Sequence, residues 1–296
     1  MTTAIAPVNG IEIGYETHGN PDDEPLLLVM GLGAQLIAWP PELCDALVDR
    51  GFFVIRYDNR DTGVSTQLDG GDGVALLSAL VPGSERQLGD VPYTLSDMAA
   101  DGLGLLSHLG IESAHVVGAS MGGMIAQTMA IEHPARVRTL TSIMSMTGEL
   151  EYGEPTPEAL AVLVGPAATT REEAIEASIE SSRVISSPVH FDEDEARTRA
   201  AEAYDRCFNP AGVVRHLLAI LASGSRAEGL SQLAVPTVVI HGALDPLITP
   251  SGGERTAELV PGADLLMLED MGHDLPPAVI GPVVEAITSL AARVHA

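Results

Sequence analysis

Ser120 lies in a short motif whose residue types suit nucleophilic catalysis. The pattern G-x-S-x-G is formed by Gly118-Ala119-Ser120-Met121-Gly122, and the apolar run 114–117 before it is typical of a buried strand. Residues 124–130 after it favour a helix. A strand, a tight turn and a helix in this order predict that the Ser120 hydroxyl projects from a sheet edge. The two glycines are expected where a Cβ atom would clash with a neighbouring strand or helix.

A serine hydroxyl needs a base that removes its proton and a carboxylate that orients the base. On a strand–turn–helix scaffold of this kind the chain order is serine, then acid, then histidine. Asp245 lies on a turn after a β-branched strand predicted over 236–242, and His273 lies in the loop after a strand predicted over 263–268. We therefore predict a catalytic triad of Ser120, Asp245 and His273.

Three other residues could compete for these roles. Asp274 adjoins His273 and is the alternative orienting acid, but neighbours in sequence rarely face each other in a loop, so we favour Asp245. His115 and His241 both fall within predicted strands. Each is interpreted as a buried structural histidine rather than as the base.

The order and strand context of these motifs resemble the α/β-hydrolase superfamily along nearly the whole chain. Residues 29–33 (Val-Met-Gly-Leu-Gly), Trp39-Pro40 and 56–65 (Arg-Tyr-Asp-Asn-Arg-Asp-Thr-Gly-Val-Ser) are similar to the aclacinomycin methylesterase-like group of actinobacterial carboxylesterases. The resemblance implies Ser120 as nucleophile, Asp245 as acid and His273 as base.

The resemblance also implies an oxyanion hole. One donor is the backbone N–H of Met121, which directly follows the nucleophile at the start of the predicted helix. The superfamily's second donor follows a His-Gly dipeptide, which is Met30-Gly31 in this sequence, so the donor is the backbone N–H of Leu32. The methionine departs from the superfamily pattern and agrees with the subgroup.

The elements that position these residues alternate between strands and helices. This alternation predicts an α/β fold with a mostly parallel central sheet flanked by helices. A hairpin is expected over 3–16 with its turn at Asn9-Gly10, and a helix capped by Ser96 is expected to reach about Leu109. Residues 66–92, which are rich in Gly, Ser and Pro, predict a long surface excursion.

The alternation stops between about 147 and 226, where the sequence has helix patterns at 157–163, 171–182, 193–206 and 212–222. Ligands of open α/β sheets bind at the carboxyl ends of strands, and this segment leaves from such an end. We therefore predict an inserted helical cap, or lid, over the active site, with an appendage away from the site as the alternative. The predicted organisation is 1–147 as the first part of the α/β-hydrolase core, 148–226 as the cap and 227–296 as the second part.

Composition limits the classes of partner. The 296 residues carry a net charge of −26, and all fifteen cations are arginines. This balance argues against nucleic acid and stable membrane association, and the missing lysine excludes Schiff-base catalysis. A solvated acidic surface is the favoured interpretation, with salt adaptation or cationic substrates as alternatives.

Targeting and metal signals are also absent from the sequence. There is no secretory signal pattern and no apolar run of about 18 residues, so we predict a cytoplasmic protein. Cys44 and Cys207 have no metal or redox spacing and are expected to be free thiols. We expect no cofactor and no metal.

Residues near the motifs raise two further expectations. Asp58, Arg60 and Asp61 are expected to hold their loop by ion pairs rather than to act on substrate. The methionines around Ser120 either line an acyl pocket or pack in the core. They are Met121, Met124, Met144 and Met146.

Taken with the resemblance, the predicted activity is that of a serine carboxylesterase working through an acyl-enzyme. Its substrate would be a medium-sized, neutral or apolar small-molecule ester, and the resemblance implies methyl esters of bulky polyketides. C–C bond hydrolysis, lactone opening and perhydrolysis use the same triad and stay open. A non-catalytic ligand receptor is a further alternative, and the oligomeric state stays open, a homo-oligomer included. Ser120 argues against the members of this fold that use an aspartate nucleophile.

Overall fold

A single eight-stranded sheet forms the centre of the computed structural model, which describes residues 3–74, 76, 88–165 and 168–294. The strand order is β1-β2-β4-β3-β5-β6-β7-β8. β2 pairs antiparallel with β1 and β4, and every other pair is parallel, so the predicted mostly parallel sheet is confirmed. The strands are β1 Ala4–Val8, β2 Ile11–His18, β3 Glu24–Val29, β4 Phe52–Tyr57, β5 Ala114–Ala119, β6 Val137–Ile143, β7 Thr237–Gly242 and β8 Asp264–Leu268.

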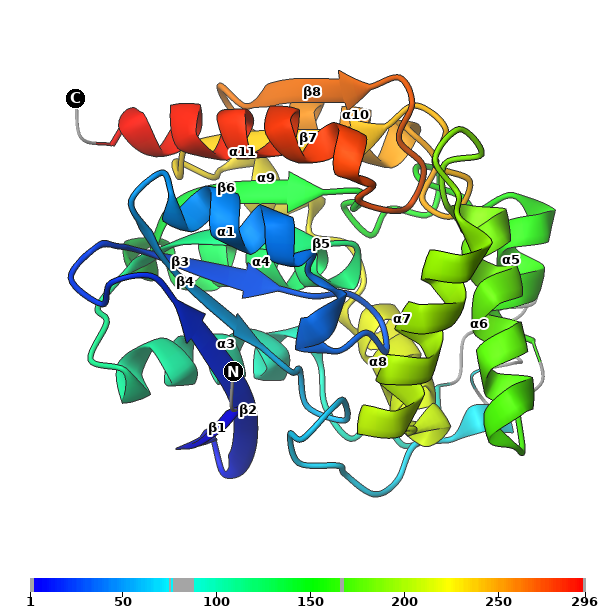
Figure 1. The fold of residues 1–296 in the computed structure, drawn as a ribbon. Helices are drawn as coiled ribbons and strands as arrows, with labels where there is room; N and C mark the ends of the chain where they lie inside the picture. The colour runs from blue at the N-terminus through cyan, green and yellow to red at the C-terminus, as the bar shows by residue number, and fades with distance from the viewer. Residues whose placement is uncertain (1–2, 75, 77–87, 166–167, 295–296) are drawn as a thin grey trace.

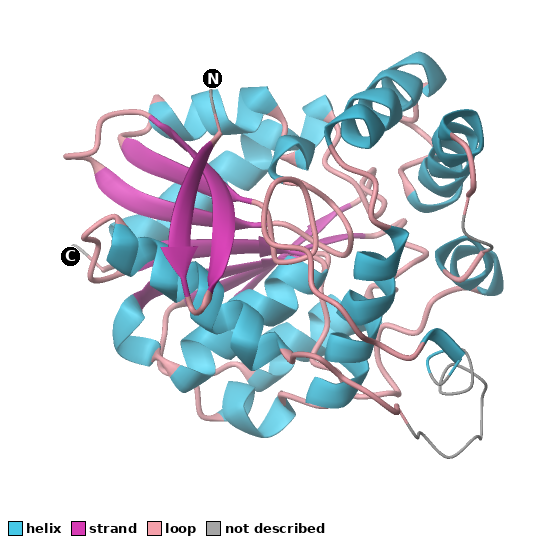
Figure 2. Ribbon diagram, turned by 90° about the horizontal axis from the view of Figure 1, so that it is seen from below, coloured by secondary structure: helices cyan, strands magenta, loops and turns pink. Residues whose placement is uncertain are grey.

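Helices cover both faces of this sheet (Figures 1 and 2). On β3, Leu26 and Leu28 pack into the core with α1 and α11, whereas Leu27 and Val29 pack into the core with α3 and α4. The alternation follows from the period of two along a strand, and it buries the strands on both faces. The flanking helices are α1 Pro41–Val48, α3 Leu95–His108, α4 Met121–Glu132, α9 Ala227–Ser231, α10 Ser251–Leu259 and α11 Pro277–Ala292.

Four more helices lie between β6 and β7 in sequence and gather at one end of the sheet. They are α5 Pro157–Leu163, α6 Arg171–Ile185, α7 Glu193–Arg206 and α8 Pro210–Ser223, referred to below as the cap helices. In Figure 1 the arrowheads of the parallel strands point toward this group, so the cap helices lie at the carboxyl ends of the strands. The four predicted helix patterns are thus found as helices, and the cap boundaries at 148 and 226 stay a prediction.

Local turn and cap signals were predicted with mixed success. The hairpin turn is confirmed, because Asn9 and Gly10 both have positive φ angles, 47° and 79°, between β1 and β2. Ser96 as the cap of α3 is wrong. The helix begins at Leu95 with Thr94 as its N-cap, and the carboxylate of Asp97, at the third helical position, accepts the Thr94 N–H.

What the structure shows of the predicted surface excursion and of membrane-spanning helices concerns the described residues only. Of the predicted excursion over 66–92, residues 75 and 77–87 lie outside the described residues. Within the described ranges, no helix is long and apolar enough to cross a membrane.

Candidate active site

Ser120 occupies a strained turn between β5 and α4. Its φ and ψ angles are 57° and −122°, in the left-handed region that residues with a Cβ atom rarely adopt. The turn is held by the Ser120 N–H, which donates to the Ile143 carbonyl at 2.9 Å. A Cβ atom on Gly118 would lie 2.1 Å from the Gly122 carbonyl oxygen, and one on Gly122 would lie 2.0 Å from the Val29 carbonyl oxygen. The expected steric reason for both glycines is therefore confirmed.

The fold places the imidazole of His273 between Ser120 and Asp245. His273 Nε2 lies 2.9 Å from Ser120 Oγ, and His273 Nδ1 lies 2.7 Å from Asp245 Oδ2. Since a carboxylate can only accept, the proton sits on Nδ1, which leaves Nε2 free to accept the serine proton. This arrangement can convert the Ser120 hydroxyl into a nucleophile.

Asp245 is fixed by its own loop. Its Oδ1 accepts the N–H groups of Leu247 and Ile248, each at 2.9 Å, while its other oxygen faces His273. The side chain is fully buried. A buried carboxylate with these partners holds one orientation, so it can fix the tautomer and direction of the His273 ring.

Two backbone N–H groups beside Ser120 could stabilise an oxyanion. Met121 is the first residue of α4, and Leu32 follows Gly31, where an added Cβ atom would lie 3.0 Å from Ser120 Cβ. In the described part of the chain, neither the Leu32 N–H nor the Met121 N–H has an acceptor within hydrogen-bond distance. Within the described residues both N–H groups are thus left free to donate to a bound group, as an oxyanion hole requires.

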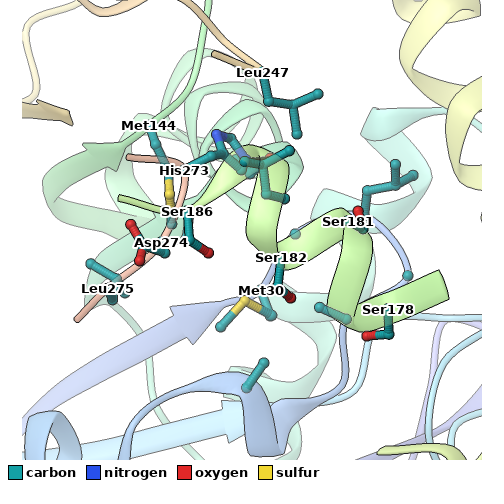
Figure 3. A pocket seen from close by; sticks show the side chains of 18 of the residues that line it. Met30, Met144, Ser178, Ser181, Ser182, Ser186, Leu247, His273, Asp274 and Leu275 are labelled. Carbon is teal, nitrogen blue, oxygen red and sulfur yellow. Dashed lines mark hydrogen bonds between the residues drawn. The ribbon is translucent and has the colours of Figure 1, made fainter. Parts of the chain in front are cut away.

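A cavity of about 660 Å³ adjoins Ser120 and His273. Ligand sites for small molecules have about this size, roughly 300–1,000 Å³. Its walls include four serines of α6 and its C-cap, and apolar side chains from other elements lie around the same cavity (Figure 3). The four methionines named from the sequence, Met121, Met124, Met144 and Met146, line this cavity. Met30 lines it as well.

Asp274, His115 and His241, the three competing residues of the sequence analysis, make hydrogen bonds to groups other than Ser120 and His273. Asp274 Oδ1 accepts the N–H groups of Ser187 and Gly272, both at 3.1 Å, and burial raises the pKa of this carboxyl. His115 contacts Thr139 at 2.9 Å, and His241 Nε2 donates to a carbonyl of its own loop at 2.7 Å.

The loop after β4 forms the expected ion pairs, with partners that the sequence did not reveal. Asp58 pairs with Arg206 of α7 and Asp61 with Arg215 of α8, both at 2.7 Å. Burial opposes ionisation of Asp61, yet hydrogen bonds from Arg215 and other donors hold its pKa below the usual range. The loop therefore attaches the cap helices to the core.

Sequence and structure comparisons agree with this fold. The sequence pattern of the alpha/beta hydrolase fold family matches residues 24–276. The chain belongs to this family of hydrolases.

Among individual relatives, rhodomycin D methylesterase DnrP from Streptomyces peucetius is 32% identical over 97% of each chain. The 3-oxoadipate enol-lactonase 2 from Acinetobacter baylyi is 25% identical over 94% of this chain and 93% of its own. Among solved structures, the esterase RhEst1 from Rhodococcus sp. ECU1013 superposes with a TM-score of 0.75 at 20% identity, over 98% of this chain and 100% of that chain. The subgroup resemblance read from residues 29–33 and 56–65 is confirmed by the methylesterase relative.

Proposed function

We propose that this chain is a serine carboxylesterase whose triad is Ser120, His273 and Asp245. His273 takes the Ser120 proton as Oγ attacks the ester carbonyl, and the N–H groups of Leu32 and Met121 stabilise the oxyanion. His273 then protonates the departing alcohol, and a water activated by the same ring releases the acid. The observation that carries the proposal is the pair of hydrogen bonds, 2.9 and 2.7 Å long, that joins the three side chains.

The walls of the cavity support a bulky acyl group of mixed polarity. The methionines, together with Leu217, Ile220 and Leu247, present apolar surface. The polar part of the wall consists of serine hydroxyls, which make no hydrogen bond within the described part of the chain. They belong to Ser178, Ser181, Ser182 and Ser186. We therefore propose an apolar acid that carries hydroxyl or carbonyl substituents.

A methyl ester of such an acid is the form we favour. The cavity volume is sufficient for a large acyl group, and the relative at 32% identity is a methylesterase. Enol-lactone hydrolysis is the second candidate, supported by the enol-lactonase relative, because ring opening is the same acyl transfer with the leaving alcohol tethered. The predictions of a cytoplasmic enzyme without a nucleic-acid partner accompany this proposal, and light scattering would establish whether it is a homo-oligomer.

Replacement of Ser120 tests the proposal. Ser120→Ala should lower kcat on p-nitrophenyl and methyl esters by about 10³-fold or more, because covalent catalysis is lost while the oxyanion donors remain. A fluorophosphonate should label Ser120 in the wild type. Ser231→Ala, on the exposed surface of α9, is the matched control and should keep wild-type kcat and labelling. Near-native turnover by Ser120→Ala, or labelling of another serine, would refute the assignment. Faster turnover of enol-lactones than of any ester would favour the second candidate.

A further inference from the structure

The loop that carries Leu32 is fastened at both ends by the segment after β4. The Asn59 side chain donates to the Met30 carbonyl at 2.8 Å, and the Leu36 N–H donates to Asp58 Oδ1 at 2.8 Å. Residues 30–36, referred to below as the oxyanion loop, therefore start and end at fixed points of the core. Between these points, the side-chain hydrogen bonds that the described residues make to the loop come from the cap helices.

Two residues connect the middle of the oxyanion loop to the cap helices. The Gly33 N–H donates to His216 Nδ1 of α8 at 3.1 Å. The Gln35 amide donates to the carbonyls of Ala203 and Cys207, at 2.7 and 3.0 Å, at the end of α7. The loop also runs close to α8, because a Cβ atom built on Gly33 would lie 2.8 Å from a methyl group of Val213.

His216 is fully buried and held in one tautomer. Its Nε2 lies 2.8 Å from the Arg60 carbonyl, which can only accept, so Nε2 carries the proton. Nδ1 is then unprotonated and accepts the Gly33 N–H. Burial lowers the pKa of His216 to about 4, so the ring is neutral at neutral pH and keeps this acceptor.

We propose that His216 is a positioning residue for the oxyanion hole: by accepting the Gly33 N–H, it holds the peptide plane after Leu32 and thereby directs the Leu32 N–H toward the Ser120 site. This inference rests on the proposed role of Leu32. A free peptide at this point can rotate, and each rotation changes the direction of the neighbouring N–H. Because an oxyanion donor acts only when it is correctly aimed in advance, the hydrogen bond to Gly33 contributes to catalysis and not to stability alone.

Two substitutions at His216 separate these roles. His216→Asn places an amide oxygen near the position of Nδ1 and keeps the acceptor for Gly33. His216→Gln places an amide nitrogen near the position of Nε2 and keeps the donor to the Arg60 carbonyl. Each variant retains one of the two hydrogen bonds, so a merely structural histidine would respond alike to both. A positioning residue would respond to the loss of the Gly33 contact.

The assay compares kcat, KM and inhibition by a trifluoromethyl ketone, which adds to the nucleophilic serine and becomes a tetrahedral oxyanion. His216→Gln should lower kcat by about tenfold to 100-fold with KM little changed, and should weaken the inhibitor by a similar factor. His216→Asn should keep most of the wild-type kcat and most of the wild-type inhibition. Ser223→Ala is the matched control on α8, because it removes the hydrogen bond from the Leu95 N–H and leaves the oxyanion loop untouched. It should lower the melting temperature without changing kcat or inhibition.

Several outcomes would overturn the inference. Equal losses in the two His216 variants, wild-type kcat in both, or a lower kcat with unchanged inhibition would each make His216 structural. If His216→Gln does not fold, Gln35→Met tests the other anchor of the oxyanion loop. It should lower kcat and weaken the inhibitor together. Wild-type kcat and inhibition in Gln35→Met would again refute the idea. Failure of the ketone and of the fluorophosphonate on the wild-type enzyme would instead refute the proposed function itself.

Discussion

Mild acid should destabilise the folded protein through His216. Burial lowers the pKa of this residue to about 4, with the Arg60 carbonyl and Asp61 raising it and two arginines lowering it further. The ring of an unfolded chain takes up its proton near pH 6.5. Between these values the unfolded state binds more protons than the folded state. The free energy of unfolding must therefore fall as the pH drops from about 6.5 toward about 4, and the loss levels off below that.

The size of the effect follows from the difference between the two pKa values. Complete protonation would cost about 3 kcal/mol, and about 2 kcal/mol of this is lost already at pH 5. Against a typical stability of about 5–15 kcal/mol, the change is easily measured. The sequence pI of about 4.4 makes pH 5 a practical lower limit, because the protein approaches zero net charge below it.

Urea unfolding followed by circular dichroism at pH 7.5 and pH 5 tests this prediction. The wild type should lose about 2 kcal/mol more between the two pH values than His216→Asn, which has no ring to protonate. All other ionisable groups are the same in both proteins, so the difference between the two isolates His216. Equal pH dependence in wild type and variant would refute the assignment of a neutral, buried ring.

The remaining predictions concern the acid, the cap helices and the ion pairs. Asp245→Asn should lower kcat by about 10³-fold or more, because the imidazole loses its tautomer control, whereas Asp274→Asn keeps its accepting oxygen and should change kcat little. The opposite ranking in steady-state kinetics would mean that the acid is misassigned. Ser182→Leu should raise kcat/KM for long alkyl esters relative to hydroxylated ones, while its fluorophosphonate labelling rate stays at the wild-type value; a uniform change across esters would speak against contact with the acyl group. Arg215→Leu leaves Asp61 buried without its cation and should cost about 3–5 kcal/mol in urea unfolding, with part of the loss recovered in the double variant with Asp61→Leu. A loss below 1 kcal/mol would show that the pair contributes little.

The three residues of the proposed triad, which the fold brings within hydrogen-bond distance, could be predicted because the proposed chemistry restricts them strongly. A strained turn requires glycines around Ser120, and the acid and base must follow strands at the same sheet edge in a fixed order. These restrictions leave traces in the local sequence of Asp245 and His273. The same holds for the hairpin at Asn9-Gly10, whose backbone angles only a few residue types adopt.

The anchors of the oxyanion loop could not be predicted, because no local pattern marks them. His216 lies in an ordinary amphipathic helix, and its partner Gly33 is 183 residues away in sequence. Asp58 was correctly expected to form an ion pair, but its partner Arg206 lies 148 residues further on. Such contacts depend on how the helices dock, which helix propensity and hydrophobic period do not specify.

The cap helices contact both sides of the reaction centre. At the end of α6, the Ile185 carbonyl accepts the N–H of His273 at 2.8 Å, and the Ser187 N–H donates to Asp274 in the same loop. On the other side, α7 and α8 hold the oxyanion loop through Gln35 and His216. Outward movement of these helices as one body would break hydrogen bonds to His273 and to the oxyanion loop together. A substitution that loosens them should therefore lower kcat even for small esters that hardly touch the cavity wall, whereas a substitution that only reshapes the wall should change the ratio between esters and leave the smallest one unaffected.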